Sequence, residues 1–371
     1  MTDDTLRILR DSAADFAKLD PARVRGLRTT RPGFDRGVWQ EMAELGWLGV
    51  LVPETHDGLD LGMDAAVIIA EQLGRALYPE PYCASAVLAT LALLHGDGEA
   101  LKRRYLPQLA AGKLLAGLAW QGESGGLDLA RCGVRTRRHE GKYVLEGISR
   151  FVEPPDADAF IVSALSENGL ELHWIERGAK GLSCTHEMRA DGSASALLCF
   201  DRVVAADDAR VASIACAASA LSLAIDCAAV AASAELLGIM DSALGLTLDY
   251  LRTRVQFGKP IGSFQALQHR AVDLYLQKEL SRAALAAACA SLKDPACTPQ
   301  QRAASASGVK ARASQAALSI CNEAVQMHGA IGFTDEYDLG LYLNRALVLS
   351  SWLGNASAHR SRYSGLLEAA A

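Results

Sequence analysis

The sequence predicts an α+β fold in which a β region lies between two helical regions, and three observations carry this prediction. Apolar side chains in residues 1–113 recur at helical spacing, with short breaks between the helical stretches. Residues 114–208 instead show short alternating and β-branched runs separated by clusters of Gly, Asn, Asp and Pro. Helical spacing returns in residues 209–371. Because 371 residues exceed what one hydrophobic core usually serves, we expect an N-terminal helical domain, a central antiparallel β domain and a C-terminal helical bundle with these boundaries.

Composition and charge argue against several classes of protein. Half of the residues are hydrophobic, which excludes a disordered chain, and the net charge of -6 argues against nucleic acid as a partner. The nine cysteines include no C-x-x-C pair, so we expect reduced thiols and neither a disulfide scaffold nor a metal site. The N-terminus, MTDDTLRILRD, is charged where a signal peptide needs an apolar run. No stretch has the composition of a membrane span, the nearest being Ala212 to Ile225, and a cytoplasmic protein is expected.

The C-terminal region is predicted to contain three long helices, at residues 212–253, 263–292 and 299–328. The first, of about 40 residues, would extend over roughly 60 Å, and helices of this length pack lengthwise in a bundle. Ser263 is expected to cap the N-terminus of the second helix.

A Gly-Pro-Gly turn separates the first two of these helices, within the stretch RVQFGKPIGSFQALQH from Arg254 to His269. The turn places a cation, Arg254, and two amides, Gln256 and Gln265, at a helix junction. A guanidinium is a permanently charged, bidentate partner for phosphate, so this corner suits a phosphate-bearing ligand. The alternative is a solvated Arg and Gln at an ordinary helix turn, and these residues alone do not decide between the two.

Two stretches give the chain a resemblance to a known family. The pattern R-x-Q-F-G-x-P-I-G-x-F-Q-x-x-Q-H, and later QMHGAIGFTDEYDL from Gln326 to Leu339, resemble the signature stretches of the acyl-CoA dehydrogenase family. The resemblance extends over nearly the whole chain and implies the acyl-CoA dehydrogenase fold. It also implies FAD-dependent α,β-dehydrogenation of an acyl-CoA thioester, an FAD seated between subunits, and an electron-transfer flavoprotein as the electron acceptor.

The resemblance implies which residues contact FAD. Arg254 and Gln265 would reach the diphosphate and adenylate portion, with Gln256 beside them and Phe257 packing on the adenine side. The following loop would line the same portion with Gln326, Met327, His328, Gly329 and Ala330. Gly329 and Gly332 allow close approach of backbone to phosphate, but a glycine at a helix C-cap is an equally good interpretation, and both can hold.

The flavin side of the site departs from the family pattern. Family members carry a T-E-x-x-x-G-S-D stretch and a W-I-T stretch that hydrogen-bond the isoalloxazine. The corresponding stretches here are WQGESGGLDL, with Leu127 in place of the serine, and FVEPP, with Glu153 in place of the threonine. A carboxylate beside the electron-rich edge of a flavin is unfavourable, so Glu153 is not expected to replace the threonine.

The catalytic base is also missing from its expected positions. The family draws its carboxylate from a Y-E-G-T stretch, aligned here with SSWLGNAS and placing Gly354 at the base position, or from the first long helix, at Ala228. Glu235 lies on the same helical face as Ala228 and is a weak candidate for the base, although an interface or capping role fits it better.

In these departures the chain resembles the small subunits of heteromeric acyl-CoA dehydrogenases, of the pimeloyl-CoA or steroid side-chain type. We therefore expect an oxidoreductase subunit of fatty acid or steroid side-chain degradation, working with a second acyl-CoA dehydrogenase subunit in a dimer or tetramer. Two alternatives remain open. In the first, the chain is a catalytically silent subunit that completes a partner's FAD site. In the second, it is a self-sufficient homomeric enzyme that uses Glu235.

Overall fold

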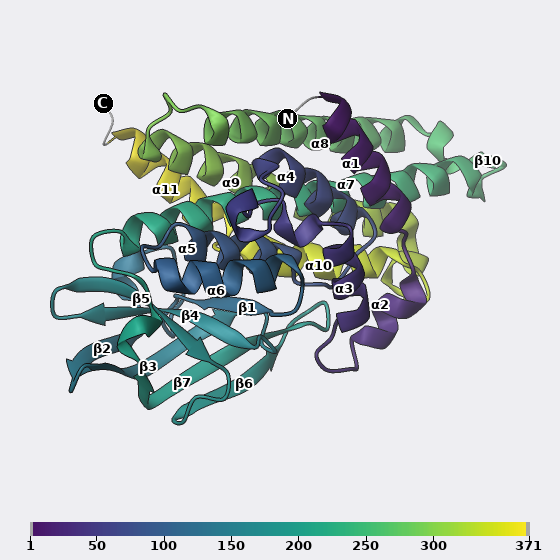
Figure 1. The fold of residues 1–371 in the computed structure, drawn as a ribbon. Coiled ribbons are helices and arrows are strands. Elements are labelled where there is room, and N and C mark those ends of the chain that lie inside the picture. Colours follow the sequence, from purple (N-terminus) through teal and green to yellow (C-terminus); the bar gives the residue numbers. More distant parts are fainter. Residues whose placement is uncertain (1–2, 369–371) are drawn as a thin grey trace. The chain divides into compact units, whose positions relative to one another are not determined.

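The computed structural model describes residues 3–368, which fall into two compact units (Figure 1). One unit comprises residues 27–66 and 79–228 and contains the large sheet. The other comprises, of the described residues, 3–26, 67–78 and 229–368 and is helical apart from one small hairpin. The order of helices, strands and helices along the chain confirms the α+β class, while the domain boundaries at residues 113 and 208 stay a prediction.

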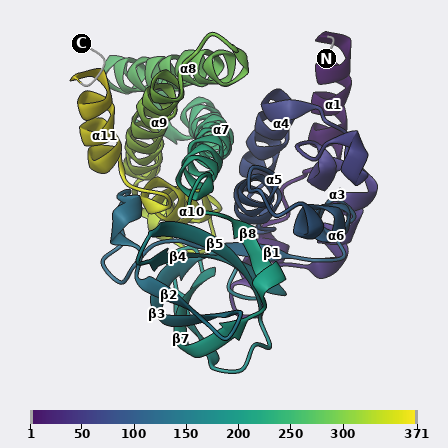
Figure 2. The same cartoon turned by 60° about the vertical axis from the view of Figure 1, so that its left-hand side comes forward.

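The sheet-containing unit has its helical elements before and beside the strands. They are α3 (Arg36–Glu44), η1 (Trp47–Gly49), η2 (Glu54–His56), the π-helical η3 (Tyr82–Ala89), α5 (Thr90–Leu94), α6 (Glu99–Ala110), η4 (Leu129–Arg131) and η5 (Asp207–Ala209). The first of them begins at a side-chain cap, because the Asp35 carboxylate accepts the Gly37 amide at 2.7 Å. In Figure 2, α5 and α6 lie beside the sheet of the same unit.

The sheet has eight strands in the order β6-β7-β3-β2-β4-β5-β8, with β1 paired to β4. The strands are β1 (Ala116–Ala119), β2 (Val134–His139), β3 (Lys142–Val152), β4 (Ala159–Ser166), β5 (Gly169–Glu176), β6 (Leu182–Met188), β7 (Ala194–Ala205) and β8 (Arg210–Ala212). The pairs β1–β4 and β2–β4 are parallel, and the others are antiparallel. The sheet is therefore mixed, whereas the sequence predicts an antiparallel one. The difference arises because the β2–β3 hairpin lies between β1 and β4 in the sequence, and β4 then runs in the same direction as β1. The core of this unit includes Leu145, Phe160, Val162 and Leu198, each fully buried.

The helical unit is built from long helices that pack on α9. Its elements are α1 (Asp3–Phe16), α2 (Pro21–Leu27, whose last residue belongs to the other unit), β9 (Val255–Gln256), β10 (Lys259–Pro260), η6 (Ile261–Ser263), α8 (Gln265–Lys293), α9 (Pro299–His328), η7 (Gly329–Phe333), α10 (Leu339–Ser351) and α11 (Ala356–Glu368). Helices α4 (Gly62–Arg75) and α7 (Ala217–Thr253) run from one unit into the other. Helix α9 contacts α8, α10 and α11, and Figure 2 shows α8, α9 and α11 together.

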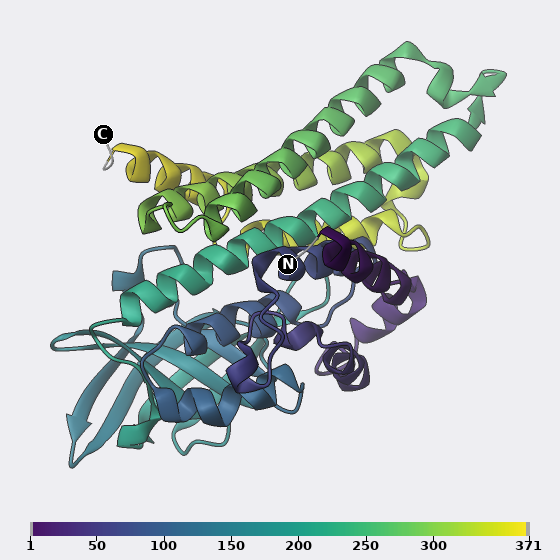
Figure 3. The ribbon, with the colours of Figure 1, turned by 45° about the horizontal axis from the view of Figure 1, so that its top comes forward.

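Close packing and ion pairs join α7 to its neighbours in the helical unit. A Cβ added at Gly74 on α4 would lie 2.1 Å from the Glu235 carbonyl oxygen, so the two helices cross with backbones nearly touching. On the other side, Asp241 of α7 is 2.7 Å from the Lys278 ammonium of α8. Figure 3 shows α7 and α8 running alongside each other up to the hairpin that joins them.

The long helices begin and end close to the predicted residues. Helix α9 matches its prediction, since Thr298 and Gln301 form a capping box and Pro299 occupies the first turn. Helix α7 begins at Ala217, five residues after the prediction. It is long and apolar enough to cross a membrane, which corrects the expectation that no stretch has this composition. However, 94% of its most apolar window is buried inside the protein, as in the core helix of a soluble fold.

Candidate functional site

The predicted corner is a small hairpin that follows α7. Strands β9 and β10 pair antiparallel, and Phe257 and Gly258 form the turn between them. Both turn residues have positive φ, 54° and 77°, as in the type I′ turns that close two-residue hairpins. The Arg254 carbonyl accepts the Ile261 amide at 2.8 Å, which closes the base of the hairpin. The turn is therefore defined by main-chain geometry, and its side chains are left to face solvent.

The side chains of the corner are exposed. The Arg254 guanidinium forms no ion pair within residues 3–368, and the Gln256 amide bonds only its neighbour's carbonyl, that of Val255. Phe257 is 90% exposed. A cation without an ion pair, three residues before an exposed aromatic ring, suits a phosphate-linked aromatic ligand.

The backbone conformation of Phe257 is consistent with a role of this residue in ligand binding. A bulky residue with φ of 54° is uncommon, since Gly, Asn or Asp usually fills this position of a type I′ turn. An aromatic side chain held there, almost fully in solvent, gains little from packing within its own chain beyond an edge contact with Phe264 at 6.0 Å. Strained backbone of this kind concentrates at functional sites.

Helix α8 starts at Gln265 without a side-chain cap. Its N-cap is Phe264, and the Ser263 hydroxyl instead donates to the Pro260 carbonyl at 2.7 Å. The prediction that Ser263 caps this helix is therefore wrong, because η6 inserts one more turn before α8 begins. The uncapped N-terminus of a 29-residue helix leaves main-chain N–H groups available to an anion.

The second predicted stretch divides into exposed and buried residues. Gln326, Gly329 and Ala330 are exposed, whereas Met327 and His328 are buried. Gly329 ends α9 with φ of 65°, which is the C-cap interpretation.

The buried His328 side chain contacts the residues on both sides of η7. Its Nδ1 lies 2.7 Å from the Ala324 carbonyl oxygen and its Nε2 lies 3.2 Å from the Tyr337 hydroxyl. The ring stacks on Tyr250 with centroids 4.4 Å apart, and burial lowers the pKa of His328, so the ring is neutral near pH 7. The buried imidazole therefore fixes η7 and the exposed residues before it, whether or not it also touches a ligand.

In the sheet-containing unit, the stretches matched to the flavin side are held by their own contacts. The Glu153 carboxylate is ion-paired with Arg189, and both side chains are mostly buried. The Gln121 amide donates to the Gly126 carbonyl at 2.9 Å. A carboxylate is an acceptor without a proton to donate, so Glu153 offers no hydrogen bond to another acceptor.

The Glu235 carboxylate is engaged as well. Its Oε1 accepts two hydrogen bonds from the Arg345 guanidinium of α10, at 2.6 and 2.9 Å. The Glu235 side chain is 7% exposed, so this is a buried ion pair.

The turn between α10 and α11 is held by two buried side chains that the sequence analysis did not single out. The Lys310 ammonium lies 2.9 Å from the Leu349 carbonyl oxygen and 3.2 Å from that of Gly354, and burial lowers the pKa of Lys310 to about 7. The His359 ring donates from Nε2 to the Leu353 carbonyl at 3.0 Å. A single lysine inside the small-residue run SASGVKARAS is the signal that could have revealed this contact.

His359 predicts a dependence of stability on pH. Burial first, and then the charge of Lys310, lowers its pKa from 6.5 to about 3. A depressed pKa gives stability that is present above pH 6.5 and is lost as the pH falls toward 3. We expect His359→Gln, which keeps a donor for Leu353, to lose about 3 kcal/mol less stability than the unmodified chain between pH 7 and 4. Chemical denaturation between pH 7 and 4 measures the difference, and equal slopes for the two proteins would contradict the assignment. The exposed His139→Gln is the matched control.

Two domains of a known protein family match this chain. The acyl-CoA dehydrogenase N-terminal domain matches residues 3–113, and the acyl-CoA dehydrogenase C-terminal domain matches residues 218–364. The acyl-CoA dehydrogenase IpdE2 of Mycobacterium tuberculosis is 30% identical over 349 residues, covering 92% of this chain and 90% of that protein. The chain belongs to the acyl-CoA dehydrogenase family.

Solved structures of acyl-CoA dehydrogenases have the same fold as this chain. The ChsE4–ChsE5 complex of Mycobacterium tuberculosis contains a chain with a TM-score of 0.88 and 26% identity, covering 99% of this chain and 98% of that one. A variant of the Tcur3481–Tcur3483 steroid ACAD gives a TM-score of 0.89 and 29% identity, with 99% and 98% coverage. Acyl-CoA dehydrogenases are FAD-dependent oxidoreductases that act on CH–CH bonds, and the predicted fold and enzyme class are thereby confirmed.

The residues present fit one half of FAD and not the other. The unpaired Arg254 guanidinium, the uncapped N-terminus of α8 and the exposed Phe257 ring supply what a diphosphate and an adenine need. At the flavin end, Glu153 is occupied by Arg189 and donates no hydrogen bond.

The two positions at which the sequence predicts the catalytic base hold no carboxylate. Ala228 is fully buried on α7. Gly354 has φ of 104°, a conformation that residues with a side chain rarely adopt, so a glutamate there would be strained. Aligning the glycine of Y-E-G-T with Gly354 places the glutamate at Leu353, whose φ of 58° a side chain tolerates better. Under this alternative alignment the expected base is still absent, because Leu353 also lacks an acid.

Proposed function

We propose that this chain is one subunit of a heteromeric FAD-dependent acyl-CoA dehydrogenase whose partner supplies the catalytic base and most of the flavin pocket. The observation that carries the proposal is the state of the carboxylates. Ala228, Leu353 and Gly354 bear none, and Glu235 is buried in an ion pair with Arg345. Removal of the α-proton of an acyl thioester needs a positioned base, so that base comes from another chain.

In this assembly FAD, when bound, accepts the β-hydrogen of the acyl chain as a hydride. The residues of this chain hold its other end. Arg254 binds the diphosphate, with Gln256 and Gln265 beside it, and Phe257 packs against the adenine. Gln326, Gly329 and Ala330 line the diphosphate and adenylate portion of FAD, in a segment whose Met327 and His328 side chains are buried in the protein. Because the side chains of Arg254, Phe257, Gln265 and Gln326 are exposed on their own chain, they suit an FAD seated mainly in a neighbour.

The surface of α8 supports assembly into a dimer or tetramer. Val272, Tyr275, Leu276 and Leu280 lie on one helical face and are each at least 50% exposed. Monomeric proteins rarely leave such a row of apolar side chains in water. The family also supports an acyl-CoA substrate and an electron-transfer flavoprotein as electron acceptor, while the cytoplasmic location stays a prediction from the sequence. The likeness to a steroid ACAD supports a steroid side chain, with a fatty acid as the alternative acyl group, and the likeness to a chain of the ChsE4–ChsE5 complex supports a second subunit.

Two other functions remain candidates. A catalytically silent subunit that only completes its partner's FAD site is favoured by the ion pair that occupies Glu153. A self-sufficient homomeric enzyme would need Glu235 as its base, and the two hydrogen bonds from Arg345 to one carboxylate oxygen oppose that role.

The visible spectrum of the purified chain tests the proposal. We expect the chain alone to carry no flavin that an acyl-CoA thioester bleaches, because the flavin end of its site lacks the donors that hold an isoalloxazine. The same preparation with a co-expressed base-bearing subunit should show a flavin spectrum that an acyl-CoA reduces. A reducible flavin in the lone chain would contradict the heteromer and support the self-sufficient enzyme.

Arg254→Ala is expected to lower the FAD content of the assembled protein without unfolding it. The substitution removes a charge-assisted bond worth about 1.5–3 kcal/mol from an exposed corner, so flavin is lost while the melting temperature of the protein chain changes little. Flavin released on denaturation, per protein chain, is the measurement. Arg252→Ala is the matched control, because Arg252 is also exposed but is paired with Asp249 at 2.9 Å. Unchanged flavin content in the Arg254 variant would remove the assignment.

A further inference from the structure

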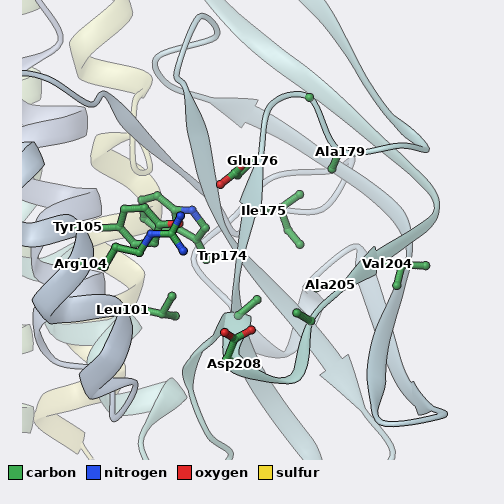
Figure 4. Close-up of a pocket in the computed structure, with 13 residues that line it drawn as sticks. Leu101, Arg104, Tyr105, Trp174, Ile175, Glu176, Ala179, Val204, Ala205 and Asp208 are labelled. Atoms are coloured by element: carbon green, nitrogen blue, oxygen red, sulfur yellow. The ribbon is translucent and has the colours of Figure 1, made fainter.

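The sheet-containing unit has a surface pocket that no part of the proposed function uses. Its volume is about 380 Å³, within the range of pockets that hold small ligands. Helix α6 forms one wall, the end of β5 with the loop after it forms the second, and the end of β7 with η5 forms the third (Figure 4). Leu101, Ile175, Ala179 and Ala205 contribute apolar surface.

One wall is a rigid stack of three side chains. The rings of Tyr105 and Trp174 are nearly parallel, with centroids 4.1 Å apart and planes inclined by 13°. The Arg104 guanidinium carbon lies 4.9 Å from the centroid of the Tyr105 ring. Tyr105 and Trp174 are at least 95% buried, so the stack is fixed before any ligand arrives.

Trp174 leaves a strong hydrogen-bonding group without a partner. Its indole N–H is buried and donates no hydrogen bond to any group of residues 3–368. A buried donor without an acceptor costs about 1–3 kcal/mol of desolvation, and a ligand that brings an acceptor recovers it. Trp174 lines the pocket, so an acceptor brought by a ligand enters beside the indole ring.

The charges of the pocket favour a cation. Glu176 and Asp208 line it on opposite sides of the stack, as Figure 4 shows, and neither forms an ion pair within the described residues. Burial is the main cause that raises the pKa of Tyr105, and both carboxylates raise it further, which places their charges close to the ring. Two carboxylates against the single guanidinium of Arg104 give the pocket a net negative charge.

We propose that this pocket binds a basic residue of a partner polypeptide. Its lysine or arginine side chain lies between Glu176 and Asp208, and its main-chain carbonyl accepts the Trp174 indole N–H. A simple amine satisfies the carboxylates but not the indole, and a free anion is repelled by both carboxylates. A basic residue within a peptide chain carries both required groups, and its aliphatic stem matches the apolar wall.

Binding of N-acetyl-L-arginine methylamide to the full chain tests this proposal, with isothermal titration as the measurement. We expect saturable binding with a dissociation constant below about 10 mM at low salt, weakening as the ionic strength rises. Trp174→Phe keeps the ring stack but removes the donor, and should weaken binding roughly 5- to 10-fold. Glu176→Gln with Asp208→Asn should weaken it at least about tenfold.

The controls separate this site from general attraction to an acidic protein. Glu167→Gln removes an exposed carboxylate from the β4–β5 turn of the same unit and should leave binding unchanged. N-acetyl-L-alanine methylamide, which has the carbonyl but not the cation, should bind at least about tenfold more weakly. No saturable binding to the unmodified chain, equal binding of the alanine probe, or binding unaffected in the Glu176/Asp208 variant would each overturn the proposal. The last variant changes exposed side chains alone, so it keeps the test valid even where Trp174→Phe unfolds the unit.

Discussion

The isolated chain is expected to oxidise acyl-CoA thioesters at a negligible rate. Nothing at Ala228, Leu353 or Gly354 can take the α-proton, and Glu235 is held by Arg345. General-base catalysis contributes roughly 10²- to 10⁴-fold, so an unassisted proton loss slows the reaction by at least that factor. Reduction of an artificial electron acceptor, followed with straight-chain and steroid side-chain thioesters, measures the rate.

Activity should return when a base-bearing acyl-CoA dehydrogenase subunit is co-expressed with the chain. Glu235→Gln in that complex is expected to leave the chemical step largely intact, because the base belongs to the partner. The heteromer proposal fails if the lone chain turns over with a flavin of its own and Glu235→Gln abolishes that turnover. Glu235 would then be the base despite its ion pair.

Features that depend on neighbouring residues could be predicted from the sequence. Pro299 after a Thr298 cap marks the start of α9, and the Gly-Pro-Gly turn marks the break between α7 and α8. The failure at Ser263 has the same local origin, since a serine hydroxyl either accepts a main-chain N–H as a helix cap or donates to a nearby carbonyl, and here it donates to the Pro260 carbonyl. The turn of η6 that decides between them carries no distinct sequence signal.

Features that depend on distant residues could not be predicted in this way. The parallel pairing of β1 with β4 joins Ala116 to Ala159 across the β2–β3 hairpin, and no periodicity reports the direction of a partner strand. The Glu235–Arg345 pair spans 110 positions, so an isolated glutamate in AASAELLGIM could equally be a base, a cap or an ion-pair partner. The predicted site contains both buried and exposed residues, and helical spacing alone does not show that His328 is buried while Gln326 is exposed.

Arg345→Met is expected to destabilise the protein by about 3–5 kcal/mol, the usual cost of leaving a buried charge without its partner. The side chains of Glu235 and Arg345 are 7% and 16% exposed, so water screens this pair little. The double variant Glu235→Leu/Arg345→Met removes both charges and should recover most of the lost stability, since apolar replacements of buried ion pairs are often neutral. The free energy of unfolding from denaturant titration measures each step.

An exposed pair supplies the matched comparison for this cycle. Arg270 and Glu323 join α8 to α9 at 3.5 Å but are 51% and 43% exposed, so Arg270→Met should cost less than about 1 kcal/mol. A loss for Arg345→Met as small as that for Arg270→Met would mean that Arg345 does not neutralise Glu235. The carboxylate would then regain its standing as a candidate base, and the argument for a partner subunit would lose its main support. A large loss that the double variant recovers instead assigns Glu235 to the structure of the bundle and leaves the α-proton to another chain.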